Sequence, residues 1–430
     1  MKILIAGQKG FSQFSTKISH RGRIGFARVE KPVRSILDQI QKKGDEALFK
    51  LTKRYDGWIP SPKTVRVKRA EILSAYQGFS REKKKALKMA AARIEKFHSL
   101  QKQASWSFAE ADGNILGQVV QPMDRVGVYV PGGKAAYPSS LLMNVIPAKV
   151  AGVREIIVSC PASGGILNPA ILVAAHIGGI DTIYKIGGAQ AIAAMAYGTQ
   201  TIPQVDKVVG PGNLYVAMAK RMVFGEVSID SIAGPSEILV ISDGTGSPAW
   251  IAADLISQAE HDEQAAAILL CTSRTFGEEV QKEIRRQLIL LPRRKIAEQA
   301  MRHYGAIFLV ENLAEAAALS NDFGPEHLEL AVSDPFRLLR KIKNAGAIFL
   351  GPYSPEAIGD YIAGPNHVLP TGGTARFSSP LGVYDFLKRS SLICLSLQGF
   401  QRLSDPALSL AQIEKLDGHR KSITSRTILG

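Results

Sequence analysis

The sequence predicts an α/β protein with two tandem, incomplete Rossmann-like parallel-sheet domains, a helical N-terminal segment and a C-terminal tail. From Arg125 onward, short β-branched runs alternate with alanine-rich stretches of helical spacing, a pattern typical of βαβ units. The alternation resumes after Ser236 with Glu-Ile-Leu-Val-Ile, which indicates a second module. The chain has 430 residues, whereas one domain usually has about 100–200.

Four segments are expected: a basic helical region at 1–125 that packs on the larger domain, α/β domains at 126–236 and 237–380, and a mainly helical, polar tail at 381–430. In the first segment, residues 31–55 and 68–103 each read as an amphipathic helix. The apolar positions of the first helix are Val33, Ile36, Leu37, Ile40, Ala47, Leu48 and Leu51. The basic residues on the solvent side of the second are Lys83, Lys84, Lys85, Lys88 and Arg93.

The positive charge is confined to the N-terminal quarter. Lys and Arg number 53 against 38 Asp and Glu, a net charge of +15. Residues 1–100 contain 24 basic and 8 acidic residues, or +16, so the remainder carries −1. A nucleic-acid surface is one interpretation. We favour a solvated helix surface, because no aromatic residues alternate with the basic ones as a stacking platform requires.

Three cysteines exclude a disulfide framework and a four-cysteine zinc site. Cys160, Cys271 and Cys394 each adjoin an apolar stretch and are predicted to be buried thiols. No stretch approaches the roughly 18 apolar residues of a membrane-spanning helix, and the opening apolar run is too short for a secretion signal. We therefore expect a cytoplasmic protein without a membrane partner.

Residues 244–249 match a loose Gly-x-Gly-x-x-Ala dinucleotide fingerprint between a predicted strand and a helix. The next strand ends in Cys-Thr-Ser-Arg and lacks the acid that holds a ribose. We therefore interpret Ser247 and Pro248 as the N-cap and first residue of the helix.

Glycine-rich loops follow three other predicted strands, at 129–133, 187–190 and 210–213. Backbone N–H groups in such loops bind anions, and adjacent strand ends form the crevice of an open α/β sheet. Glycine at such turns is often only a steric requirement. A nucleotide-sized pocket at this edge is therefore a hypothesis, and a purely steric role for these glycines stays open beside it.

Four of the eight histidines have polar neighbours at suggestive spacing. Gln258 and His261 are three residues apart on a predicted helix and share a face. Glu326 and His327 follow Gly-Pro at a predicted helix start. Asp360, His367, Glu414 and His419 complete the set. An amide oxygen, a carboxylate and imidazoles suit Zn²⁺, but no zinc-finger or His-Glu-x-x-His spacing occurs, and from spacing alone a solvent-exposed helix surface is the favoured interpretation.

The ordered motifs resemble those of the histidinol dehydrogenase family. They include Ile-Asp-Ser-Ile-Ala-Gly-Pro-Ser-Glu at 229–237, Asp-Leu-Ile-Ser-Gln-Ala-Glu-His-Asp at 254–262 and Gly-Asp-Tyr-Ile-Ala-Gly-Pro-Asn-His at 359–367. Arg-Val-Gly-Val-Tyr-Val-Pro-Gly-Gly, Gly-Pro-Glu-His-Leu-Glu and Leu-Asp-Gly-His also match, and the similarity extends from about residue 30 to 425. The first 30 residues match nothing in this pattern.

The resemblance implies a zinc-dependent homodimer, with one ion per subunit, that oxidises L-histidinol to L-histidine through an aldehyde, using two NAD⁺, in histidine biosynthesis. It implies that 126–236 binds the dinucleotide, that 237–380 carries the metal and catalytic residues, and that the tail is exchanged between subunits. The implied residues are Gln258, His261, Asp360 and His419 for the metal, Glu326 and His327 for catalysis, and Tyr129, Gln190 and Asn213 for the dinucleotide. Ser236, His367 and Glu414 are implied substrate contacts, together with His327 and the metal ligands.

This chemistry requires a base that removes the hydroxyl proton as hydride leaves, and His327 suits that role near neutral pH. Glu326 beside it is suited to activating water for the second step. A related dehydrogenase acting on another polar alcohol, such as a sulfonated diol, is the principal competing hypothesis. Glu414, which would meet the substrate amine, favours histidinol. A metal-dependent hydrolase would produce no NADH, and a nucleic-acid binder would lose affinity steeply with salt.

Overall fold

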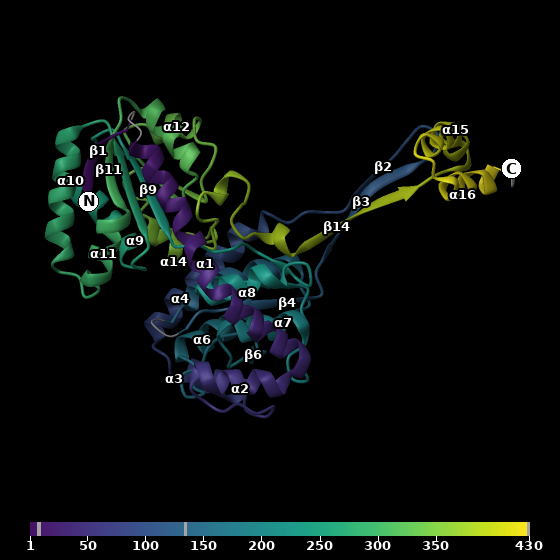
Figure 1. The fold of residues 1–430 in the computed structure, drawn as a ribbon, viewed down its shortest axis with the longest axis horizontal. Coiled ribbons are helices and arrows are strands. Elements are labelled where there is room, and N and C mark those ends of the chain that lie inside the picture. The colour runs from purple at the N-terminus through teal and green to yellow at the C-terminus, as the bar shows by residue number, and fades with distance from the viewer. Residues whose placement is uncertain (7–9, 133–135, 428–430) are drawn as a thin grey trace. The chain divides into compact units, whose positions relative to one another are not determined.

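The computed structural model describes residues 1–6, 10–132 and 136–427, with the backbone alone for 19–25. The chain divides into two compact units, which are described separately. Unit 1 comprises Met1–Gln101 and Met123–Phe386, and unit 2 comprises Lys102–Pro122 and Leu387–Gly430. None of the described helices has both the length and the apolar character of a membrane-spanning segment. Figure 1 shows the succession of strands and helices.

Both large sheets of unit 1 are parallel, which confirms the predicted α/β class. The first has the order β6-β5-β4-β7-β8. Its strands are β4 (Arg125–Tyr129), β5 (Glu155–Ser159), β6 (Ile183–Tyr184), β7 (Lys207–Val209) and β8 (Ser228–Ile229). Its helices are α5 (Pro138–Ala151), α6 (Pro169–Gly178), α7 (Gly188–Tyr197) and α8 (Leu214–Val223). Val126 and Val128 face the core beneath α5 and α6, whereas Tyr129 faces the core beneath α7 and α8.

The second sheet has the order β1-β11-β10-β9-β12-β13. Its strands are β1 (Lys2–Ile5), β9 (Glu237–Ser242), β10 (Ala266–Cys271), β11 (Gly305–Leu309), β12 (His327–Ala331) and β13 (Ala347–Leu350). Its helices are α9 (Pro248–Ala259), α10 (Arg274–Leu288), α11 (Arg294–Tyr304), α12 (Leu313–Phe323), α13 (Pro335–Leu339) and α14 (Glu356–Tyr361). Ile238 and Val240 contact the layer of α9, α10 and α11, whereas Leu239 and Ile241 point to the opposite layer, as strand alternation requires.

Helix α1 (Gly10–Lys43) belongs to the cores of both sheets. Phe11 and Ile18 pack against the six-stranded sheet, whereas Val33, Ile36 and Ile40 pack against the five-stranded sheet. All seven apolar positions predicted for the 31–55 segment are buried. A single amphipathic helix therefore buries apolar side chains in both modules of unit 1.

The N-terminal region is more divided than predicted. The helix expected at 31–55 is two helices, because Gly44 takes φ of 52° between α1 and α2 (Asp45–Asp56). The helix expected at 68–103 is α3 (Arg69–Gly78) and α4 (Arg81–Ser99), and Ser80 caps α4 by accepting from the Lys83 amide. Strand β1, which the sequence pattern did not predict, pairs with β11.

Lys83, Lys85 and Lys88 are exposed, as predicted for a solvated face. Arg93 is exposed as well, and its guanidinium donates to the carbonyls of Ile362 and Ala363 at 2.7 and 2.9 Å, whereas Lys84 is only partly exposed. Residue 93 therefore holds the segment that follows α14.

Unit 2 contains an antiparallel sheet in the order β14-β3-β2 and two helices. They are β2 (Trp106–Ala109), β3 (Ile115–Pro122), β14 (Leu387–Cys394), α15 (Leu397–Ile413) and α16 (Asp417–Thr427). The tail predicted as mainly helical at 381–430 contains α15 and α16 but begins with a strand that was not predicted, because β14 pairs with β3, almost 270 residues earlier, at Leu387↔Pro122. Short 3₁₀ turns, η1 (Thr374–Arg376) and η2 (Val383–Phe386), precede it. Cys160 and Cys271 are buried as predicted, but Cys394 is exposed at the end of β14.

Gly210, after β7, is held by a buried ion pair between Lys220 and Asp230. Asp230 accepts a hydrogen bond from the Gly210 N–H at 2.8 Å, and the Lys220 ammonium donates one to the Gly210 carbonyl at 2.9 Å. Gly210 has φ of +111°, and a Cβ there would overlap the Tyr129 carbonyl oxygen. Gly246 has a similar φ of +106° with no atom within 4 Å of such a Cβ.

Gly210→Ala is therefore expected to destabilise the protein by at least about 2 kcal/mol more than Gly246→Ala, because only the former adds overlap to strain. Thermal unfolding measures the difference, at about 2–4 °C per kcal/mol for modules of this size. Equal losses of stability in the two variants would contradict the steric argument.

Candidate functional site

Parallel pairing of β9 with β12 positions the acid and base that the sequence singled out. Glu326 precedes β12 and His327 begins it, so the predicted helix start at this dipeptide is wrong. The backbone of Glu237, which begins β9, contacts both side chains. Its N–H donates to Glu326 Oε2 at 2.8 Å, and its carbonyl oxygen lies 3.0 Å from His327 Nδ1. Both groups are therefore held at the amino end of the six-stranded sheet.

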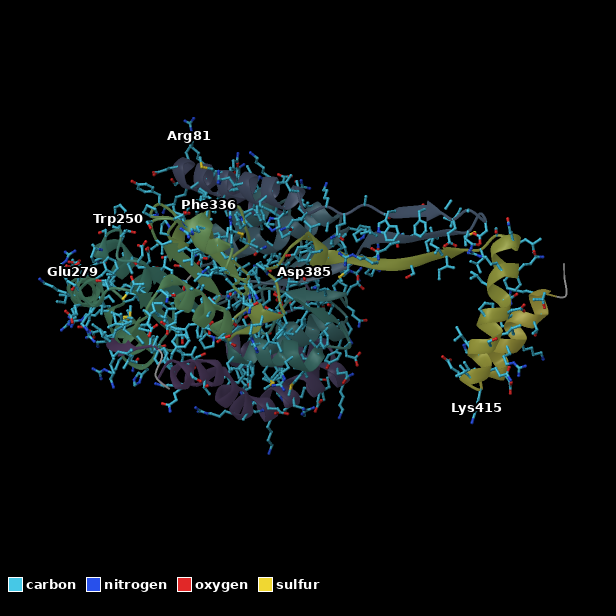
Figure 2. All side chains as sticks on the ribbon, turned by 90° about the horizontal axis from the view of Figure 1, so that it is seen from above. Arg81, Trp250, Glu279, Phe336, Asp385 and Lys415 are labelled. Atoms are coloured by element: carbon cyan, nitrogen blue, oxygen red, sulfur yellow. The ribbon has the colours of Figure 1, made fainter. Side chains whose placement is uncertain are left out.

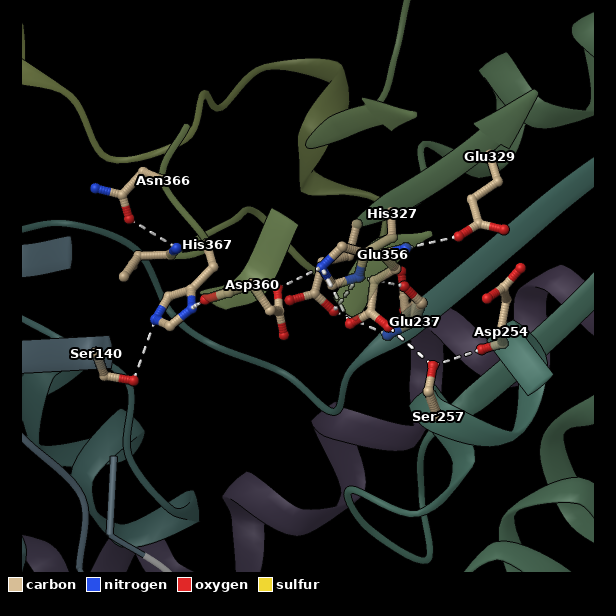
Figure 3. A network of polar contacts seen from close by, with 12 residues as sticks. Ser140, Glu237, Asp254, Ser257, His327, Glu329, Glu356, Asp360, Asn366 and His367 are labelled. Carbon is tan, nitrogen blue, oxygen red and sulfur yellow. Dashed lines mark hydrogen bonds and ion pairs between the residues drawn. The ribbon is translucent and has the colours of Figure 1, made fainter. Parts of the chain in front are cut away.

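The contact with the Glu237 carbonyl assigns the proton of His327 to Nδ1, because a carbonyl oxygen only accepts. The other nitrogen, Nε2, is buried and makes no hydrogen bond with the described residues. It lies 3.6 Å from Asp360 Oδ1 and 3.9 Å from Glu356 Oε1. Figure 3 shows these carboxylates converging on the imidazole from α14.

Burial and negative charge perturb the whole cluster. Burial raises the pKa of Glu326 to about 8, although the charge of His327 acts in the opposite direction. Burial also raises the pKa of Glu356, to about 7. Burial alone would lower the pKa of His327, but the neighbouring carboxylates of Glu326, Asp360 and Glu356 raise it to about 10. The cluster has an excess of negative charge that a bound cation would offset.

The donor atoms at one side of this cluster fit a metal ion. Ligand atoms of His261, Glu356 and Asp360 lie within 4.8 Å of one another. Gln258 is fully buried on α9, and neither atom of its amide group has a hydrogen-bond partner among the described residues. Such an amide costs about 1–3 kcal/mol unless something else satisfies it. His261 lies in the turn after α9, where its N–H donates to the Gln258 carbonyl at 3.2 Å.

Glu356 is the member of the cluster that the sequence pattern did not predict. Its Oε2 accepts from Ser257 Oγ at 3.0 Å, and its N–H donates to Glu329 Oε1 at 2.8 Å, so it joins α14 to α9 and β12 (Figure 3). Glu356 and Asp360 are four residues apart and share a face of one short helix. That i, i+4 pair of acids was the available signal.

His367 and Ser236 border this cluster. Both ring nitrogens of His367 contact protein oxygens, at 2.7 Å from the Asp360 carbonyl and 3.1 Å from Ser140 Oγ on α5. Ser236 directly precedes Glu237. A cavity of about 570 Å³ opens onto His327, Asp360 and His367. Its other walls include the apolar side chains of Phe349, Ile358 and Leu381.

Tyr129, Gln190 and Asn213 line a second cavity of about 610 Å³ at the carboxyl end of the five-stranded sheet. The structure thus brings together the three strand ends that the glycine loops indicated, although Gly133 lies outside the described residues. The first amides of α7 are not open to an anion. Gly187 N–H donates to Asp56 Oδ2 at 2.9 Å and Gly188 N–H to Tyr129 Oη at 3.1 Å.

Two predicted site residues belong to unit 2. Glu414 follows α15 as its C-cap and His419 lies in the first turn of α16. Both are exposed within their own unit. Their contribution to the cluster of unit 1 stays a prediction.

Two parallel sheets carrying a buried acid–base cluster and a separate strand-end cavity define an α/β enzyme of two modules. The family model described as Histidinol dehydrogenase matches residues 19–427. Histidinol dehydrogenase of Syntrophotalea carbinolica is 52% identical over 426 residues, covering 99% of each chain. That of Geobacter sulfurreducens is 52% identical over 427 residues, covering 99% of this chain and 100% of the relative.

The crystal structure of histidinol dehydrogenase from Elizabethkingia anophelis superposes with a TM-score of 0.88 at 38% identity, over 93% of this chain and 92% of that one. The chain belongs to the histidinol dehydrogenase family. The resemblance that the motifs indicated is thereby confirmed.

The unpartnered amide of Gln258 yields a prediction about the metal. In chelator-treated protein, Gln258→Leu should unfold at the same temperature as the parent or higher, because it removes a buried polar group without a partner. Added Zn²⁺ should raise the unfolding temperature of the parent and raise that of the variant less. Differential scanning calorimetry measures both effects.

Gln287→Leu is the matched control, because its Nε2 already donates to the Ala249 carbonyl at 2.8 Å. It should lose stability and keep the full response to Zn²⁺. A response to Zn²⁺ in Gln258→Leu equal to that of the parent would exclude the amide from the metal site.

Proposed function

We propose that this chain oxidises L-histidinol to L-histidine through an aldehyde, with two NAD⁺ and one Zn²⁺ per subunit. The observation that carries the proposal is the buried cluster of His327, Glu326 and Asp360, in a chain that its family matches nearly end to end. Residues 126–236 are the proposed dinucleotide-binding domain, and residues 237–380 are proposed to carry the metal and catalytic residues. The proposed location is the cytoplasm.

His327 is the proposed base for both oxidations. A bound cation would offset the carboxylates that raise the pKa of His327 and so favour the neutral imidazole, in which the Glu237 carbonyl holds the proton on Nδ1 and Nε2 would remove the substrate hydroxyl proton. Glu326, fixed by the Glu237 N–H, stands beside it to activate the water that hydrates the aldehyde. The cavity bordering His327 shields the aldehyde from release between the two steps.

Gln258, His261 and Asp360 are the proposed metal ligands of unit 1, with His419 as the fourth ligand. An amide oxygen, two imidazoles and a carboxylate form a donor set suited to Zn²⁺, which would orient the substrate nitrogens and offset the negative charge of the cluster. Glu356 holds Asp360 and His327 in place from the same helix. Ser236, His367 and Glu414 are the proposed further substrate contacts.

The strand-end cavity is the proposed dinucleotide site. Gln190 is buried with its Nε2 unpartnered, and Tyr129 and Asn213 also line the cavity. NAD⁺ bound there would accept the hydride of each oxidation.

A homodimer with exchanged tails is the proposed assembly, and nucleic acid is not a proposed partner. Ala411 is the one buried apolar side chain of unit 2 within the described residues. Many large apolar side chains of this unit are exposed: Trp106, Phe108, Ile115, Ile393, Leu397, Leu410 and Ile413. Unit 1 also exposes Trp250 and Phe336, both seen at its surface in Figure 2. Apolar surfaces of this kind favour a second copy of the chain.

Zinc-loaded protein with L-histidinol and excess NAD⁺ should yield two NADH per histidinol, measured by absorbance at completion. His327→Asn should lower kcat by about 10²–10⁴-fold, the usual contribution of a general base. His303→Asn, on the exposed face of α11, is the control and should leave kcat unchanged.

One NADH per histidinol would indicate an alcohol dehydrogenase that releases its aldehyde. Production of NADH from a sulfonated diol but not from histidinol would replace the proposal with a dehydrogenase of that other polar alcohol.

Tail exchange predicts complementation between inactive variants. Co-expressed His327→Asn and His419→Asn chains should regain about a quarter of the parent activity, because half of the dimers are mixed and each mixed dimer has one complete site. Co-expressed His327→Asn and Asp360→Asn are the matched control and should stay inactive, because both residues belong to unit 1. Inactivity of both mixtures would contradict exchange.

A further inference from the structure

One acidic side chain projects into the strand-end cavity from outside the five-stranded module. Asp56 is the last residue of α2 and lines the cavity together with Tyr129, Gln190 and Asn213. Among the described residues that line this cavity, Asp56 is the only charged one. Within the described part of the lining, a protein with a net charge of +15 therefore presents a single negative charge and no cation.

Asp56 lies beside the loops that follow β5 and β6. A Cβ on Gly187 would overlap the ring of Pro161, two residues after β5, so these two loops are in contact. Asp56 Oδ2 accepts from the Gly187 N–H at 2.9 Å, which places the carboxylate beside that contact. In doubly wound dinucleotide sites, an acid at the end of the second strand accepts from the ribose hydroxyls.

Here the second strand of the module, β5, ends at Ser159 and is followed by Cys-Pro, so its end provides no acid. Asp56 brings the missing carboxylate from a helix about 100 residues earlier. The Gly187 amide is its one hydrogen-bond partner among the described residues, so the carboxylate retains accepting capacity.

The rest of the lining suits an adenosine. Tyr55 and Tyr215 are half-exposed at the cavity and offer aromatic faces to a flat base. Gln190, 1% exposed, has an amide nitrogen without a partner and therefore offers a buried donor. Acceptor, donor and aromatic faces thus occur together in one cavity.

We propose that Asp56 accepts hydrogen bonds from the ribose hydroxyls of the adenosine half of the dinucleotide and thereby excludes a 2′-phosphorylated dinucleotide. The inference rests on the proposed dinucleotide site. A 2′-phosphate at this position would face a carboxylate with no neighbouring Lys or Arg in the described lining to compensate. Asp56 is therefore a specificity residue of the proposed reaction.

The first test compares NAD⁺ with NADP⁺ in the zinc-loaded enzyme with histidinol. The parent should favour NAD⁺ in kcat/KM by at least about 100-fold, the size expected of like charges placed together. Asp56→Asn keeps an oxygen for the Gly187 N–H but removes the charge. It should narrow the preference by about tenfold or more, mainly through a lower KM for NADP⁺.

Glu46→Gln is the matched control, because it removes the same charge from the exposed side of the same helix. It should leave the preference unchanged. An unchanged preference in folded Asp56→Asn would overturn the assignment. A parent without NAD⁺-dependent activity would instead overturn the proposed function.

A second test needs no variant. Calorimetric binding to the parent should rank adenosine 5′-diphosphate above its 2′-deoxy analogue by about tenfold, and adenosine 2′,5′-bisphosphate weakest. Equal binding of the three nucleotides would exclude recognition of the ribose by a carboxylate, even if Asp56→Asn fails to fold.

Discussion

The pairing of β9 with β12 is the interaction on which the site depends. It sets the N–H of Glu237 against Glu326 and the carbonyl of Glu237 against His327, so one peptide segment orients both the acid and the base. The strands lie between two layers of apolar side chains, and a one-residue slip would turn His327 to the other face. Packing of Ile238 and Leu239 therefore maintains the geometry of the acid and the base.

The cluster beside this pair gathers several buried carboxyl groups around one imidazole. Glu326, Glu356 and Asp360 all approach His327, and burial raises the pKa of the two glutamates. The unpartnered amide of Gln258 adds a second unfavourable feature. Both features agree with a site that becomes stable when a cation binds. One ion would offset the charge of the carboxylates and would also bind the amide oxygen of Gln258.

The acid–base cavity and the strand-end cavity lie at opposite ends of their parallel strands, and the N-terminal helices contribute to the module around each. The acid–base pair lies at the amino end of the six-stranded sheet, whereas Tyr129, Gln190 and Asn213 lie at the carboxyl end of the five-stranded sheet. Helix α1 packs on both modules, and α2 delivers Asp56 to the second cavity. The basic quarter of the chain is therefore structural as well as solvated.

The sequence pattern alone predicted the two α/β modules, the buried face of residues 33–51 and the motifs of the family. Strand and helix periodicity depend only on residues that are close together in the sequence. The pattern was insufficient for β1 and β14, whose partners β11 and β3 lie about 300 and 270 residues away. The same reason applies to Glu356 and Asp56. Glu356 joins its site through a contact with His327, and Asp56 joins its site through a contact with Gly187. Such contacts form only when the chain folds, so the spacing of neighbouring residues cannot predict them.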